Sequence, residues 1–154
     1  MRIRILYLLF FILIFCNCNG QQVEKTEAGN TKEHTFQMVS VPSVITEPEE
    51  RAAYLVKHYW DKFDFTDTTL IHFPEITEQA TSNYIDMMKY VPAKVAASSI
   101  KEMMSKASTD SSMFVYFSGL YEKYLYDPNS PMLNEEFYIP VLKYIVNSER
   151  VGEV

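Results

Sequence analysis

The stretch from Met113 to Tyr126 is apolar on almost every side of the helix that it would form, and this limits the folds open to the chain. Its only clearly polar face consists of Ser118, Glu122 and Lys123. A helix of this kind is stable only where other elements cover it, so we expect it at the centre of a packed domain. Gly119 costs about 1 kcal/mol relative to Ala within a helix, and we expect it to mark the close approach of a neighbouring element.

Four other segments carry apolar residues at three- and four-residue spacing, which predicts amphipathic helices. Thr46 can cap the first of them, and Pro48 suits its first turn. Pro92 separates two helices, and residues 127–131 form a rigid turn. Pro140 lies inside the last segment, so that helix either kinks there or begins there.

We therefore predict an all-α fold, a compact bundle of about five antiparallel helices, since short links favour antiparallel neighbours. The helices are expected at about 48–63, 75–90, 93–107, 111–126 and 135–147. They should pack around the fourth helix, with Phe117, Leu120, Tyr121 and Tyr124 among the most buried residues.

The first eighteen residues have the order of an export signal. Arg2 and Arg4 form a short positive start, the run from Ile5 to Phe15 is apolar, and short residues follow it. This run is too short to span a bilayer comfortably, which takes about 20 residues. We therefore expect export, with an uncleaved anchor helix as an alternative.

The two cysteines of the chain, Cys16 and Cys18, both lie at the end of the apolar run. A disulfide between them would not stabilise the mature domain, so we interpret Cys18 as a lipid attachment point. Asn17 suits the position before that cysteine better than Phe15 suits the position before Cys16. Cleavage after Gly20 is the alternative. The expected protein is anchored by its N-terminal lipid, in the periplasm or on the outer membrane.

Composition divides the chain into a signal, a tether, a helical domain and the start of a linker. Residues 1–18 form the signal, and residues 19–46 are expected to be a flexible tether, in which Phe36 to Pro42 lies extended against the domain. The helical domain spans 47–148, and residues 149–154 begin a linker to a missing C-terminal domain. Loss of residues 1–17 leaves 12 Lys and Arg against 20 Asp and Glu, a net charge of −8. This charge disfavours nucleic acid as a partner.

The sequence holds no motif that is typical of catalysis or metal binding. His34, His58 and His72 lack metal-ligand spacing, and zinc needs three or four converging ligands. No Gly-x-Ser-x-Gly elbow is present, and the 4 glycines do not form a phosphate-binding loop. We assign no catalytic residue, no metal ligand and no cofactor.

Aromatic residues make up 14% of the chain and are its one compositional excess. Most of these rings lie at core spacing and are expected to fill the core. Tyr116, Tyr126 and Tyr138 fall off the apolar stripes, around the proline-rich turn. They are our candidates for a ligand or partner surface, since amphipathic rings suit partly apolar, wet sites.

The segment YLYDPNSPMLNEEFYIPVL at residues 124–142 resembles a helical domain of unknown function found in exported lipoproteins of Gram-negative anaerobes. The segment WDKFDF at 60–65 resembles the first helix of that domain and its exit, and the resemblance covers roughly residues 42–148. In that family the helical domain commonly precedes a thioredoxin-like domain with a Cys-x-x-Cys pair. This chain has no such pair.

The resemblance implies a non-catalytic helical interaction module of an envelope lipoprotein, related to thioredoxin-like thiol-disulfide oxidoreductases and truncated before the redox domain. A stand-alone version of the domain is the alternative to truncation. We do not expect an enzyme. The expected partners are the membrane, through the lipid, and a thioredoxin-like domain or another envelope protein. The alternative function is a surface lipoprotein that binds a glycan or a peptide through exposed aromatics.

Overall fold

The computed structural model describes residues 35–148, which form five α-helices and one 3₁₀ helix and contain no strand. The predicted all-α fold is confirmed. The predictions for the signal, for Cys18, for the first part of the tether and for the linker concern residues outside this range. The elements are α2 (Pro48–His58), η1 (Thr68–His72), α3 (Pro74–Met88), α4 (Ala93–Ala107), α5 (Ser111–Leu125) and α6 (Glu135–Val146).

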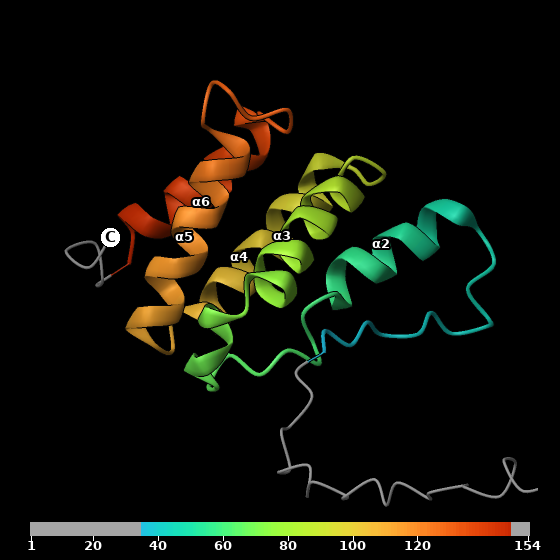
Figure 1. Cartoon of the computed structure of the whole chain (residues 1–154). Helices are drawn as coiled ribbons and strands as arrows, with labels where there is room; N and C mark the ends of the chain where they lie inside the picture. The colour runs from blue at the N-terminus through green and yellow to red at the C-terminus, as the bar shows by residue number, and fades with distance from the viewer. Residues whose placement is uncertain (1–34, 149–154) are drawn as a thin grey trace, which may run out of the picture. The chain divides into compact units, whose positions relative to one another are not determined.

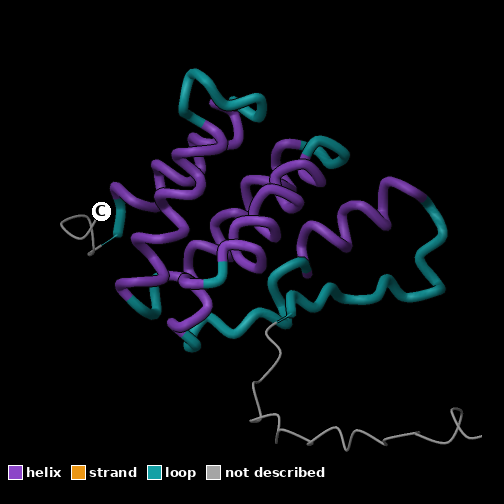
Figure 2. The backbone as a smooth tube through the Cα atoms, viewed as in Figure 1, coloured by secondary structure: helices purple, strands orange, loops and turns teal. Residues whose placement is uncertain are grey.

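Successive helices run in opposite directions, as predicted, and stack into two layers (Figures 1 and 2). α4 packs against α2, α5 and α6, whereas α5 packs against η1, α3, α4 and α6. In the view of Figure 1, α3 and α5 lie in front of α4 and α6. The loops that join the helices therefore gather at the two ends of the bundle.

The centre of the domain is shared between α4 and α5. Phe117, Leu120 and Tyr121 on α5 are buried as predicted, but Tyr124 is only half-buried. α4 contributes an equally buried face, and α2 packs against α3 and α4 rather than mainly against α5. The expectation of a single central helix is therefore wrong, because α4 presents a second fully covered apolar stripe.

α2 ends at His58 instead of continuing to residue 63. A helix that continued as far as Phe65 would separate Trp60 and Phe65 by about 7.5 Å along its axis. The turns that follow α2 instead bring Trp60, Phe63 and Phe65 around Phe117, with ring centroids 5.5, 5.8 and 5.7 Å from it. The early end of α2 thus lets three rings converge on one buried partner.

The segment before α2 packs against the domain from Phe36 onward. The ring of Phe36 stacks on Tyr59 at 4.9 Å and meets the edge of Trp60 at 5.4 Å. Lys62 Nζ donates a hydrogen bond of 3.3 Å to the carbonyl of Met38. The expected extended contact of residues 36–42 is therefore present, and the packed part of the chain begins before Thr46.

Side-chain caps set the start of two helices. The Asp110 side chain accepts hydrogen bonds from backbone N–H groups in the first turn of α5, and the Asn134 side chain accepts one from the first turn of α6. The N-cap residue of α2 is Glu47 rather than Thr46, and its side chain makes no capping hydrogen bond. α6 begins at Glu135 and continues through Pro140, so the alternative that this helix begins at Pro140 is wrong.

Two expectations for α5 are wrong. Gly119 is exposed, and a Cβ atom placed there would meet no atom within 4 Å, so it marks no close approach. Ser118 lies in the core and not on the polar face, and its Oγ has no hydrogen-bond partner. Gly119 leaves space on the outer side of the helix, between the exposed residues Val115, Glu122 and Lys123.

A buried hydrogen-bond relay joins three helices. The Tyr84 hydroxyl on α3 donates to Ser99 Oγ on α4 at 2.6 Å, and Ser99 Oγ donates to the carbonyl of Val56 on α2, also at 2.6 Å. Val56 lies in the last turn of α2, where backbone carbonyls lack helical partners. Ser99 thus satisfies a buried helix end, and burial raises the pKa of Tyr84, which stays neutral and able to donate.

We predict that Ser99→Ala destabilises the domain by about 1–3 kcal/mol, because it leaves the Val56 carbonyl and the Tyr84 hydroxyl unpaired in the core. Ser118→Ala is the matched control. Both serines are helical and buried, at 5% and 2% exposure, but Ser118 makes no hydrogen bond to lose. Thermal and urea unfolding of the two variants measures the difference, and equal stability of the two variants would contradict the role of the relay.

Candidate functional site

The structure brings together two of the three tyrosines predicted to form a surface. Tyr126, just after α5, stacks on Tyr138 of α6 with ring centroids 5.1 Å apart and planes at 19°. Tyr126 is 52% exposed, whereas Tyr138 is buried beneath it. Tyr116 is separate from this pair, because its hydroxyl shares a 2.7 Å hydrogen bond with Thr77 Oγ1 of α3.

A hollow of about 450 Å³ lies beside Tyr126. We call it the Tyr126 hollow. Tyr126 lines it and Tyr138 does not. Its lining residues are Gly119, Glu122, Lys123, Tyr126, Asp127 and Pro128.

The loop after α5 is held in one shape by short-range hydrogen bonds. Asp127 Oδ1 accepts from the backbone N–H of Asn129 at 2.8 Å, and Ser130 Oγ donates to the carbonyl of Tyr124 at 2.5 Å. The backbone N–H of Asn134 returns to the carbonyl of Leu125 at 3.0 Å. These bonds fix the position of the loop that carries Tyr126 and Asp127.

The charged groups that line the Tyr126 hollow differ in whether they already have a partner. Lys123 is already engaged, because its ammonium forms an ion pair with Glu78 of α3. The Tyr124 hydroxyl donates to the same carboxylate oxygen at 2.7 Å. The ion pair with Lys123, helped by the Tyr124 bond, lowers the pKa of Glu78, and burial together with Glu78 raises that of Tyr124 to about 12.

Glu122 forms no ion pair within residues 35–148. It lies near the buried Tyr138, whose pKa is raised by burial and, to a smaller extent, by the charge of Glu122. The Tyr126 hollow therefore presents a free carboxylate next to an exposed aromatic face.

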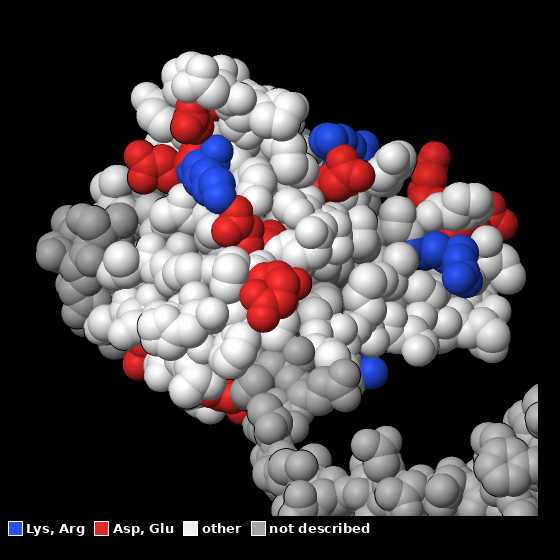
Figure 3. Space-filling view, in the orientation of Figure 1, with Lys and Arg blue, Asp and Glu red and all other residues white. Residues whose placement is uncertain are grey.

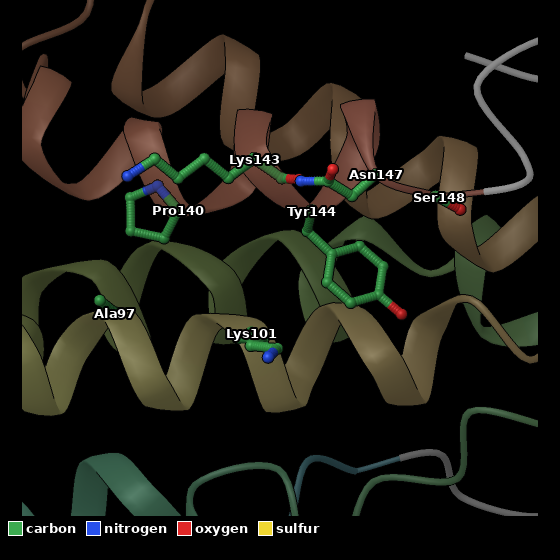
Figure 4. Close-up of a pocket in the computed structure, with 7 residues that line it drawn as sticks. All are labelled: Ala97, Lys101, Pro140, Lys143, Tyr144, Asn147 and Ser148. Atoms are coloured by element: carbon green, nitrogen blue, oxygen red, sulfur yellow. The ribbon is translucent and has the colours of Figure 1, made fainter.

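A second hollow, of about 610 Å³, lies between α4 and α6 (Figure 4). We call it the α4–α6 hollow. Tyr144 points from α6 toward α4, and Lys143 extends along α6 over Pro140. Lys101 rises from α4 on the opposite wall. The remaining lining residues are Ala97, Asn147 and Ser148.

The α4–α6 hollow is cationic. Lys101 and Lys143 are exposed and make no ion pair with any residue that the structure describes, and the lining contains no acid. The Tyr144 hydroxyl and Ser108 Oγ form a hydrogen bond of 2.9 Å, which holds the Tyr144 ring in place. The sequence did not predict this site, since its residues come from two helices that only packing brings together.

The rest of the described surface carries charged side chains of both signs. Acidic and basic side chains are interspersed on the face in Figure 3, with uncharged surface between them. His58 pairs with Asp61 at 2.7 Å, and Lys106 reaches the same carboxylate at 3.0 Å. No group of metal-binding side chains occurs within residues 35–148. None of the helices described there is long and apolar enough to cross a membrane.

Comparison with known proteins places the chain in a family. The model of a domain of unknown function, DUF5106, matches residues 16–154, so the chain belongs to this family. A thioredoxin-like protein from Bacteroides caccae ATCC 43185, solved as a crystal structure, is 46% identical with a TM-score of 0.73. The match covers 78% of this chain and 44% of that one, so this chain spans less than half of its length. A search of curated proteins finds no match.

We predict that the ion pair beneath the Tyr126 hollow makes stability depend on pH. Because the pKa of Glu78 is lowered in the folded state, its contribution is present above the unfolded value of about 4.5 and is lost as pH falls through the folded value. Wild type should therefore exceed Glu78→Gln in stability at pH 6, and the difference should shrink as the pH falls below about 4.5. Thermal melts across this range measure it. Glu122→Gln, which breaks no ion pair, is the control.

Proposed function

We propose that this domain is a non-catalytic interaction module that accompanies a thioredoxin-like domain in the cell envelope. The observation that carries the proposal is the 46% identity with a protein described as thioredoxin-like. At this identity two domains share more than a general fold, so a related role is the simplest expectation.

The helical domain is not itself the thioredoxin-like part of such a protein. A thioredoxin-like fold is built on a β-sheet, and residues 35–148 of this chain contain no strand. The match leaves more than half of the Bacteroides caccae protein uncovered. We infer that the uncovered part carries the sheet, and that the matched helical part assists it.

The α4–α6 hollow is our candidate for the contact face. It lies at the end of α6, and the family resemblance places the thioredoxin-like domain after the helical one. Its two ammonium groups, on Lys101 and Lys143, form no ion pair with described residues and favour an acidic surface on that partner, because opposite charges steer and orient association.

The second candidate function is a surface that binds a glycan or a peptide. The exposed, stacked ring of Tyr126 favours it, since such rings suit ligands with both apolar and polar surfaces. The two functions predict binding at different places, the α4–α6 hollow for the first and the Tyr126 hollow for the second.

The first test measures binding between the full mature chain and the uncovered part of the Bacteroides caccae protein by calorimetry. We expect saturable binding that Lys101→Glu and Lys143→Glu each weaken about tenfold. Lys57→Glu, an exposed lysine of α2 outside the hollow, is the matched control. Absence of binding by wild type, or equal loss in the control, would refute the proposed function. An insulin-reduction assay on residues 19–154 alone should show no turnover above buffer, since thiol-disulfide exchange needs a free thiolate.

We further propose that Cys18 carries the lipid that attaches the protein to the envelope. This cysteine follows a short apolar run, and the helical domain has no use for it. Metabolic labelling with a fatty-acid analogue should mark wild type and not Cys18→Ala, which should also leave the membrane fraction. Undiminished label in the variant would overturn this assignment.

A further inference from the structure

The Tyr126 hollow has the features of a binding site for a planar cation. We propose that it binds an arginine side chain presented by a partner protein. This goes beyond the proposed function, because it concerns a different surface and holds whether or not the partner is thioredoxin-like.

The first observation is a fixed aromatic platform. Tyr138 backs Tyr126 at 5.1 Å, which restrains the exposed ring. The space next to the ring is open because Gly119 has no side chain, and a Cβ atom there would meet nothing within 4 Å. A guanidinium group stacks well on such a face.

The second observation is the balance of hydrogen-bonding groups. Three donors around the hollow are in use: the backbone N–H groups of Tyr126 and Asp127 both bond to the carbonyl of Glu122, and the Lys123 ammonium is paired with Glu78. The acceptors are available, because Glu122 has no ion-pair partner among the described residues and Asp127 uses only Oδ1. A site rich in free acceptors selects a ligand rich in donors.

The third observation is electrostatic. The hollow lies at the C-terminal end of α5, where the helix dipole favours cations, and it carries two carboxylates against one neutralised lysine. An anion would be repelled by these carboxylates. Arginine suits the site better than lysine, because its planar fork can stack on Tyr126 while it meets the Glu122 carboxylate with two N–H groups.

The test uses the full mature chain and N-acetyl-arginine amide as the probe, followed by NMR. We expect saturable shifts of the Gly119 amide and the Tyr126 ring signals. The uncharged isostere N-acetyl-citrulline amide should bind at least tenfold more weakly. Tyr126→Ala and Glu122→Gln should each weaken arginine binding about fivefold.

Two further variants separate occupancy of the hollow from general charge effects. Gly119→Gln keeps a good helix former at an exposed position and should abolish binding by filling the hollow. Glu49→Gln removes an exposed carboxylate of α2, outside the hollow, and should bind like wild type. Equal binding of citrulline, unchanged binding by Gly119→Gln, or saturable binding of methyl glucoside in place of arginine would each overturn the proposal. The calorimetric test of the α4–α6 hollow is unaffected by these results.

Discussion

The packing of the domain depends on how the backbone carbonyl groups at the end of α2 are hydrogen-bonded. α2 stops at His58 inside the domain, and the Val56 carbonyl in its last turn would be unpaired without Ser99. Ser99 accepts from Tyr84 in turn, so the same hydroxyl ties α2, α3 and α4 together. Because an unpaired buried carbonyl is costly, these helices are held in one relative position. That position permits the turns that place Trp60 and Phe65 against Phe117.

This arrangement gives α5 two different roles. Its inner side meets the aromatic cluster through Phe117, and its outer side carries Gly119 and Glu122 toward solvent. Its C-terminal end continues into a loop that hydrogen bonds hold against α5 and the start of α6, which presents Tyr126 as a fixed surface. A helix that is locked in the core is a rigid base for a surface site, because side chains anchored on it lose little freedom on binding.

The two hollows differ in charge, and together they suit a protein that contacts partners. The α4–α6 hollow offers two lysines that form no ion pair with described residues, whereas the Tyr126 hollow offers the Glu122 carboxylate beside an aromatic ring. Neither resembles a catalytic centre in composition, and membership of DUF5106 assigns no reaction. The proposed role beside a thioredoxin-like domain rests on the 46% identity with a protein described as thioredoxin-like, of which the match covers 44%.

The sequence alone determined the five helices, most of their bounds and the burial of Phe117 and Tyr121, because apolar spacing, caps and prolines act within a few residues. It also singled out Tyr116, Tyr126 and Tyr138 as residues off the apolar stripes, which is wrong for Tyr138, because that ring is buried on α6. It failed for the end of α2, for Gly119 and for Ser118, and it did not indicate Lys101 with Lys143. Those features depend on which helices become neighbours. The donor to a buried carbonyl and the residues that line a hollow come from segments far apart in the sequence, so they meet only after these segments have packed.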